Sequence, residues 1–238
     1  MIKIALLGYG KMGHEVERVA IELGISVHVT IDNDQEWLQK GYLLPECNVA
    51  IEFSTPQIAV DNIFKCIDAG IPVIVGTTGW YDRLVEVKEY CRSHDGTLFY
   101  ASNFSIGVNI FFEINRKLAS LLEAYPNYLP SMYEIHHSQK LDAPSGTAIT
   151  LAEDIIRSNH RVQKWTDNKA QANELPILSV REGSVPGTHC ITWNSEVDLI
   201  SITHEAKNRR GLAVGALMAA QWVIGKKGVF SMKDMLAI

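Results

Sequence analysis

The sequence has little of several features that mark particular classes of protein. Its 238 residues include only four cysteines, with no Cys-x-x-Cys pair, so neither a zinc site nor a disulfide framework is predicted. No apolar run approaches the roughly 20 residues of a membrane span, and the opening apolar run is too short for a signal peptide. No run of basic residues is interleaved with aromatic ones, and the net charge is −5, so nucleic acid is not an expected partner. The remaining composition, 47% hydrophobic and 21% charged, is typical of a cytoplasmic globular enzyme.

Apolar, β-prone runs alternate with helical patterns through the first hundred residues. The pattern predicts strands over 2–7, 26–31, 49–53, 73–75 and 98–101. It predicts helices between them over 16–23, 58–69 and 84–91. Near-continuous apolar strands separated by helices indicate a parallel sheet that is covered on both faces.

After about residue 103 the pattern changes. Helices are predicted over 108–122 and 147–158, a polar loop over 160–175, and strands over 131–135, 178–181, 189–193 and 199–204. The last three strands are joined by short turns, which indicates a second sheet that is at least partly antiparallel. A final helix over 212–224 is apolar nearly all round and is predicted to be buried.

These patterns predict an α/β protein of two domains. Residues 1–104 form a Rossmann-like dinucleotide-binding domain, which residues 208–238 complete. Residues 105–207 form a smaller α+β domain that is built on a mixed sheet and binds the substrate.

A glycine-rich turn between the first strand and the first helix is the candidate cofactor site. Its residues are Gly8, Tyr9, Gly10, Lys11, Met12 and Gly13. The first glycine permits the tight turn, the second lets the backbone approach a pyrophosphate, and the third lets helix and strand pack closely. Amides at the helix start would face the phosphate charge. The alternative is an ordinary structural turn.

The end of the second strand bears on the choice of cofactor. Asp32 can accept hydrogen bonds from the adenosine ribose and would repel a 2′-phosphate. Asn33 follows, where an arginine often binds that phosphate, although Lys11 offers some positive charge. The sequence therefore favours NADH over NADPH.

Two further turns follow strands at the edge where open α/β sheets bind ligands. Their candidate cofactor-binding residues are Gly76, Thr77 and Thr78, and Ala101, Ser102, Asn103 and Phe104. Arg209, just before the final helix, is a candidate contact to cofactor or substrate. The alternatives are plain turns and a solvated arginine.

A second group of candidate residues surrounds the end of the 131–135 strand. A reductase must deliver a proton beside the hydride, and His136 and Lys140 are the candidate donors. Neighbouring strand residues point to opposite faces, so His136 and His137 can serve one site only if the strand ends between them.

The helix that follows has a start suited to an anion. Ser145 is a good N-cap, and the amides and hydroxyl of Gly146 and Thr147 can receive a carboxylate. The structural alternative is a capped helix beside two polar strand-end histidines. No metal site is predicted, because no third ligand stands at a recognisable spacing.

The stretch Glu134-Ile-His-His-x-x-Lys-x-Asp-Ala-Pro-Ser-Gly-Thr-Ala148 resembles the signature of the dihydrodipicolinate reductase family. Supporting stretches are Gly8 to Gly13, 75–79, 103–109, Arg181-x-Gly183 with Gly187-x-His189, and Ile202-x-His204. The resemblance implies reduction of a cyclic imine dicarboxylate to tetrahydrodipicolinate with NAD(P)H, in lysine and diaminopimelate biosynthesis. It also implies a homotetramer that associates through the second domain's sheet.

The resemblance also assigns roles to individual residues. It places His136 at the proton donor, Lys140 at a second proton donor, and His137, Gly146 and Thr147 at substrate-binding positions. With this assignment we expect Ser145 also to bind the substrate, and Lys140 to act either as the donor or as a charge clamp. Two other functions stay open from the residues alone: another small-substrate dehydrogenase of amino-acid type, and a non-catalytic NAD-binding sensor.

Overall fold

The computed structural model describes residues 1–238, which form two compact units. The first unit comprises Met1–Ile106 with Arg209–Ile238, and the second comprises Gly107–Asn208. No helix in either unit is long and apolar enough to cross a membrane.

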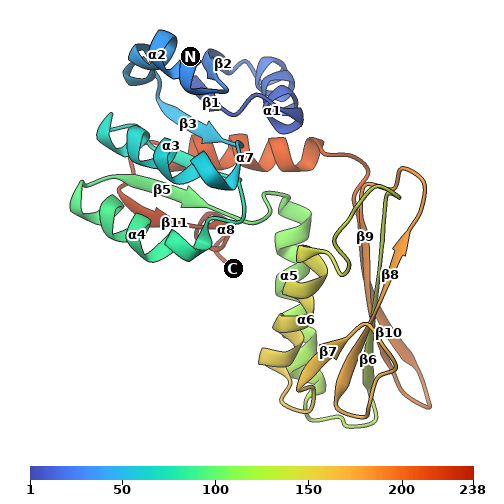
Figure 1. Ribbon diagram of the computed structural model, residues 1–238. Helices are drawn as coiled ribbons and strands as arrows, with labels where there is room; N and C mark the ends of the chain where they lie inside the picture. Colours follow the sequence, from blue (N-terminus) through green and yellow to red (C-terminus); the bar gives the residue numbers. More distant parts are fainter. The chain divides into compact units, whose positions relative to one another are not determined.

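A six-stranded, wholly parallel sheet forms the centre of the first unit (Figure 1). Its order is β11-β5-β4-β3-β1-β2. The strands are β1 (Lys3–Leu7), β2 (Ser26–Ile31), β3 (Val49–Glu52), β4 (Val73–Val75), β5 (Thr97–Tyr100) and β11 (Gly228–Phe230). All four residues of β3 and all three of β4 are buried, as expected for strands covered on both faces.

Helices cover both faces of this sheet. One core cluster contains α3 (Pro56–Asp68) and α4 (Leu84–Ser93), and the other contains α1 (Lys11–Glu22) and α7 (Arg210–Val223). The remaining helices are α2 (Asp34–Lys40), α8 (Met232–Leu236) and the 3₁₀ turns η1 (Gly41–Glu46) and η2 (Tyr81–Arg83). Helix α7 is buried along most of its length, which confirms the prediction for the final helix.

The second unit has a mixed five-stranded sheet, ordered β10-β9-β6-β8-β7. Its strands are β6 (Leu129–His136), β7 (Lys164–Thr166), β8 (Glu174–Arg181), β9 (Thr188–Asn194) and β10 (Leu199–Glu205). Strand β6 runs parallel to β8 and antiparallel to β9. Helices α5 (Ile106–Leu122) and α6 (Gly146–Ser158) lie on one face, and no helix covers the other (Figure 1).

Alternation along β6 separates the two faces of this sheet. Met132 and its neighbours Ile177 and Ile191 join the core beneath α5 and α6. Tyr133, one residue further on, points to the other face and is partly exposed, as the two-residue period of a strand requires.

The predicted α/β fold, with a parallel sheet and a second mixed sheet, is confirmed. The predicted loop over 160–175 is wrong in part, because it contains β7 and the start of β8. Strand β7 is a three-residue edge strand with a polar sequence, which is too short to show alternation. Helix α2 and strand β11 also have no counterpart among the predicted elements, since each is short.

Candidate active site

The glycine turn after β1 has the close packing that the sequence predicts. Gly8 has a φ of 86°, and a Cβ there would lie 2.3 Å from the carbonyl oxygen of Phe53. A Cβ on Gly13 would lie 2.5 Å from the carbonyl oxygen of Gly8. Gly10 is the N-cap of α1, but no side chain caps the helix, and a Cβ there would meet nothing within 4 Å. The turn therefore leaves the first amides of α1 open to an anion.

Asp32 lies exposed at the end of β2, and its carboxylate also holds the glycine turn. Its Oδ1 accepts a hydrogen bond of 2.5 Å from the Tyr9 amide. The next side chain, Asn33, accepts from the Glu36 amide at 3.0 Å and so caps α2. Asn33 therefore has a structural role at the position where an arginine would bind a 2′-phosphate.

A cleft beside Asp32 collects acidic side chains. Besides Asp32 it is lined by Asp34 and Asp61. Lys65 also lines the cleft, and its Nζ lies 4.4 Å from the centre of the Trp37 ring. Among the residues that line this cleft, carboxylates therefore outnumber cations.

The other predicted cofactor residues lie at the ends of β4 and β5. Gly76 must be a glycine, because a Cβ there would lie 2.0 Å from the Phe53 ring. Thr77 is buried, whereas Thr78 is exposed. After β5, Ala101 is half-buried, Ser102 is exposed, the Asn103 side chain accepts from the Ser105 amide, and Phe104 is buried. Arg209 is exposed beside Arg210, which forms an ion pair with Glu22.

A buried carboxyl that the sequence did not single out lies next to these turns. Glu52, at the end of β3, has no exposed surface, and burial raises its pKa. Its side chain accepts hydrogen bonds from Ser54 and Asn62, and Asn62 in turn accepts one from the Trp37 indole. This network connects the acidic cleft to the interior of the sheet.

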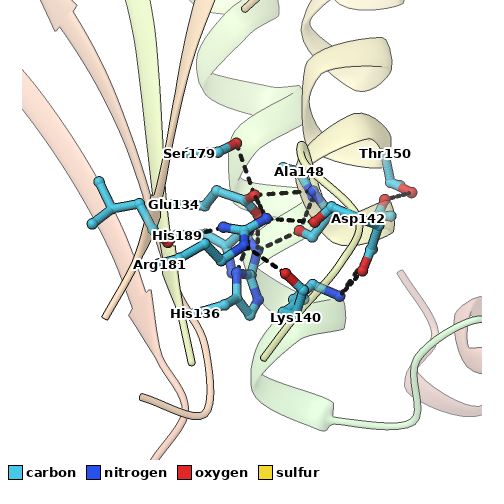
Figure 2. A network of polar contacts seen from close by, with 12 residues as sticks. Glu134, His136, Lys140, Asp142, Ala148, Thr150, Ser179, Arg181 and His189 are labelled. Atoms are coloured by element: carbon cyan, nitrogen blue, oxygen red, sulfur yellow. Dashed lines mark hydrogen bonds and ion pairs between the residues drawn. The ribbon is translucent and has the colours of Figure 1, made fainter. Parts of the chain in front are cut away.

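In the second unit, strand register gathers polar side chains at one end of the inner sheet face. Glu134 on β6 pairs with Ser179 on β8 and with His189 on β9. Two residues further on, His136 pairs with Arg181. Figure 2 shows these side chains converging on the Glu134 carboxylate. We call Glu134, His136, Ser179, Arg181 and His189 the inner-face cluster.

The Glu134 carboxylate is the centre of the inner-face cluster and has no exposed surface. Its Oε1 accepts from the Ser145 amide at 3.0 Å, the Ser179 hydroxyl at 2.9 Å and the Arg181 guanidinium at 3.1 Å. Its Oε2 lies 3.3 Å from His136 Nδ1 and 3.5 Å from His189 Nε2. Burial alone would raise the pKa of Glu134, but hydrogen bonds from His136, His189 and Ser145 outweigh it and hold the pKa well below the ordinary range.

Arg181 connects the inner-face cluster to the following loop. Its guanidinium donates to the carbonyl oxygens of Lys140, at 3.3 Å, and of Asp142. The Lys140 ammonium forms an ion pair with Asp142, with Nζ–O distances of 2.8 and 2.9 Å (Figure 2). The predicted donor Lys140 is thus partly exposed and already has an anionic partner.

Strand β6 ends at His136, so the alternation of side chains along the strand does not fix the direction of the His137 side chain. His136 is buried and points to the same face as Glu134, while His137 lies beyond the strand and is half-buried. The rule that adjacent strand residues oppose each other does not apply to His137.

The start of α6 lies next to the inner-face cluster. Ser145 accepts from the Ala148 amide at 3.2 Å, which confirms it as the N-cap. Gly146 is exposed and Thr147 half-buried. The Ser145 hydroxyl lies 3.2 Å from His189 Nε2.

Three side chains of the inner-face cluster are of the kinds that can bind a metal ion, although the sequence showed no third ligand at a recognisable spacing. Ligand atoms of Glu134, His136 and His189 lie within 4.8 Å of one another. The carboxylate, however, already accepts from the Arg181 cation and two further donors. Its charge is therefore compensated by the protein, and we describe the cluster as a hydrogen-bonded one.

Comparison with known proteins supplies the family. The model for the N-terminal part of dihydrodipicolinate reductase matches residues 2–104, and that for its C-terminal part matches 107–236. The 4-hydroxy-tetrahydrodipicolinate reductase of Christiangramia forsetii is 45% identical over 99% of this chain and 98% of its own. The chain belongs to the dihydrodipicolinate reductase family.

More distant relatives agree with this family and show how widely the fold is shared. The reductase of Methanopyrus kandleri is 32% identical over 99% of this chain and 97% of its own. A dipicolinate-bound dihydrodipicolinate reductase from Paenisporosarcina has a TM-score of 0.75 at 24% identity, with 98% of each chain covered. Aspartate dehydrogenase of Thermotoga maritima has a TM-score of 0.50 at 11% identity, covering 95% and 98%. These structural similarities establish the fold.

Sequence reasoning singled out His136 but not the side chains that hold it. Glu134, Arg181 and His189 stood in the family signature without a role, and Ser179 was not considered. The spacing Glu134-x-His136 did carry a signal, because residues two apart share one face of a strand. The contributions of β8 and β9 depend on strand register, which no local pattern gives.

The burial of His189 makes stability depend on pH. Burial, with the nearby His136, lowers the pKa of His189 below its ordinary value of 6.5. The unfolded chain therefore binds a proton that the folded chain does not, and the free energy of unfolding should fall as pH decreases below about 6.5. One such group gives a slope of at most about 1.4 kcal/mol per pH unit.

We expect His189→Gln to flatten this slope between pH 7 and 5 in urea unfolding experiments. Part of it should remain, since burial also lowers the pKa of His204. His94→Gln, at an exposed histidine that contacts Ser93 and the Tyr90 carbonyl oxygen instead of a carboxylate, should leave the slope unchanged. An identical slope in the His189 variant would contradict this account.

Proposed function

We propose that the protein reduces 4-hydroxy-tetrahydrodipicolinate, through its dehydrated dihydro form, to tetrahydrodipicolinate in lysine and diaminopimelate biosynthesis. The observation that carries the proposal is the position of His136, buried in the inner-face cluster next to the anion-receptive start of α6. The names and near-complete coverage of the relatives support the same reaction.

The chemistry divides between cofactor and protein. Bound NAD(P)H would supply a hydride to the ring carbon β to the imine. His136 donates a proton to the adjacent carbon, directly or through water, so that the C=C bond is reduced. The net reaction consumes one NAD(P)H and one proton and releases water from the hydroxylated substrate.

The substrate's two carboxylates require positive charge and donors. His137, Lys140 and the start of α6 at Ser145, Gly146 and Thr147 provide them. Lys140 would exchange or share its Asp142 partner when a substrate carboxylate binds. Charge-assisted hydrogen bonds of this kind are about twice as strong as neutral ones.

The first unit would hold the cofactor. The glycine turn leaves room and free amides for a pyrophosphate, and Asp32 lies where it can accept from the ribose. We assign the nicotinamide end to the turns after β4 and β5, at Gly76–Thr78 and Ala101–Phe104, with Arg209 as a further contact.

We further propose that NADH is preferred over NADPH. A 2′-phosphate would enter a cleft with three carboxylates, those of Asp32, Asp34 and Asp61, against the single amine of Lys65. Asn33 is occupied as a helix cap and offers no cation. Lys11, exposed at the start of α1, would reduce this preference but not reverse it.

The uncovered face of the second sheet supports assembly into a homotetramer. Leu129, Leu178 and Leu199 are each more than half exposed on this face, and Tyr133 lies among them. A group of large apolar side chains on one sheet face is typical of an interface. We propose that copies of the chain, in the cytoplasm, associate through this face.

The reaction and the roles of His136 and Lys140 are tested by a coupled assay, in which the product of the preceding synthase is mixed with NADH or NADPH. His136→Ala should lower kcat by about 100-fold or more and change KM little, since it removes a proton donor. Lys140→Ala should lower kcat and raise KM, whereas Lys169→Ala, at an exposed lysine of the same unit, should do neither.

Three outcomes would contradict these assignments. Near-normal turnover without His136 would remove its role. Oxidation of NADH only with a 2-oxo acid and ammonia, or reduction of NAD⁺ only with an amino acid, would favour an amino-acid dehydrogenase. Cofactor binding without turnover of any cyclic imine would favour a sensor.

The cofactor preference is tested by steady-state kinetics with both cofactors. We expect a higher kcat/KM with NADH. The double variant Asp34→Asn with Asp61→Asn removes two negative charges and should lower KM for NADPH by roughly 10-fold at low salt, with little effect on NADH. Asp82→Asn, an exposed acid outside the cleft, is the control. An unchanged cofactor ratio would contradict the electrostatic explanation.

The proposed assembly is tested by light scattering after size-exclusion chromatography. The native chain should elute as a tetramer, and Leu178→Glu should dissociate it, because a charge would be buried in an apolar interface. Leu38→Glu makes the same change at a residue that is 88% exposed in the first unit, and it should leave the tetramer intact. A monomeric native chain would rule out the assembly.

A further inference from the structure

The side chains behind His136 have no part in binding or reduction as proposed above, yet they are buried and polar. Glu134, His136 and His189 are each less than 8% exposed. Burial of a carboxylate and two imidazoles costs free energy unless these groups form hydrogen bonds or ion pairs with one another. The geometry of the inner-face cluster indicates which of these interactions orients His136.

The two oxygens of Glu134 have different surroundings. Oε1 accepts from three donors, which come from the start of α6 and from β8. This fixes the plane of the carboxylate and directs Oε2 at the imidazole of His136, 3.3 Å from Nδ1. Neither Oε2 nor Nδ1 forms a hydrogen bond to any other group, and Nδ1 of His136 at 3.3 Å lies nearer to Oε2 than does Nε2 of His189 at 3.5 Å.

A carboxylate can only accept a hydrogen bond, so Nδ1 of His136 must carry the hydrogen. The proton that leaves or joins the ring must then use Nε2. That nitrogen lies beside Gly187, where a Cβ would approach it to 3.0 Å. The glycine therefore keeps side-chain atoms away from the reactive edge of the ring.

The groups around His136 also determine how much positive charge collects there. Glu134 and Arg181 compensate each other at 3.1 Å, and Lys140 is paired with Asp142. Burial, and the nearby charge of His136, lower the pKa of His189, which keeps this second imidazole neutral. A proton on His136 is then the one added charge in the cluster.

We propose that Glu134 is a positioning residue: it holds the hydrogen on Nδ1 of His136, so that Nε2 delivers the proton. The proposal rests on the proposed function for the role of that proton. The preferred tautomer, by contrast, follows from the carboxylate alone and can be measured without turnover.

The first test is Glu134→Gln. The amide keeps an oxygen for the Ser145, Ser179 and Arg181 donors but presents an NH₂ group to Nδ1, which favours hydrogen on Nε2 instead. We expect kcat to fall about 100-fold with KM within a few-fold. Glu134→Asp, which again presents an acceptor to Nδ1, should restore part of the lost kcat.

The second test is ¹⁵N NMR of the full chain labelled at histidine, with His136 assigned from the spectrum of His136→Gln. In the native chain at high pH, the neutral ring should show a protonated Nδ1, and in Glu134→Gln a protonated Nε2. This measurement does not require activity, so it decides the tautomer even if the proposed reaction is wrong. A protonated Nε2 in the native chain would overturn the proposal, whether or not any variant folds.

Asp154→Asn is the matched control, because Asp154 is another buried carboxylate of the same unit, paired with Arg116 and Arg157. It should lower stability while leaving kcat and the His136 tautomer unchanged. If Glu134→Gln folds and behaves in the same way, Glu134 has only a structural role and the proposal fails.

Discussion

The buried, ionised carboxylate of Glu134 is the constraint that orders the second unit's candidate site. A charge without solvent must be surrounded by donors, and each donor comes from an element whose position is thereby fixed. The Ser145 amide fixes the start of α6, and the Arg181 guanidinium fixes the end of β8. The Arg181 guanidinium also donates hydrogen bonds to the carbonyl oxygens of Lys140 and Asp142, and so holds the loop in place. One charge thus helps to fix the positions of both His136, the proposed proton donor, and the loop that carries Lys140.

The position of this charge follows from the strand period. Met132, Ile177 and Ile191 make the inner sheet face apolar, and the next inward residues, Glu134, Ser179 and His189, make it polar. The site therefore lies one pleat, about 6.6 Å, from packed core. Side chains held on neighbouring strands of a packed sheet have little freedom, which suits a geometry that proton transfer requires.

Local patterns predicted most of the fold but, within the inner-face cluster, only His136. The glycine turn, the Ser145 cap and the apolar strands each depend on a few adjacent residues, so the sequence reveals them. The partners of Glu134 lie 45 and 47 residues further along, at Ser179 and Arg181, and only register brings them together. The short, polar β7 was missed because three residues cannot display a period.

The fold itself does not choose the reaction. The parallel sheet and glycine turn suit many dehydrogenases, and aspartate dehydrogenase of Thermotoga maritima shares the architecture at 11% identity. In this chain the charges around His136 balance: Glu134 offsets Arg181, and Asp142 offsets Lys140. In the proposed reaction, a proton on His136 is therefore an added positive charge, and an anionic substrate favours that state. Substrate binding and proton loading then support each other, as linkage requires of two ligands whose charges attract.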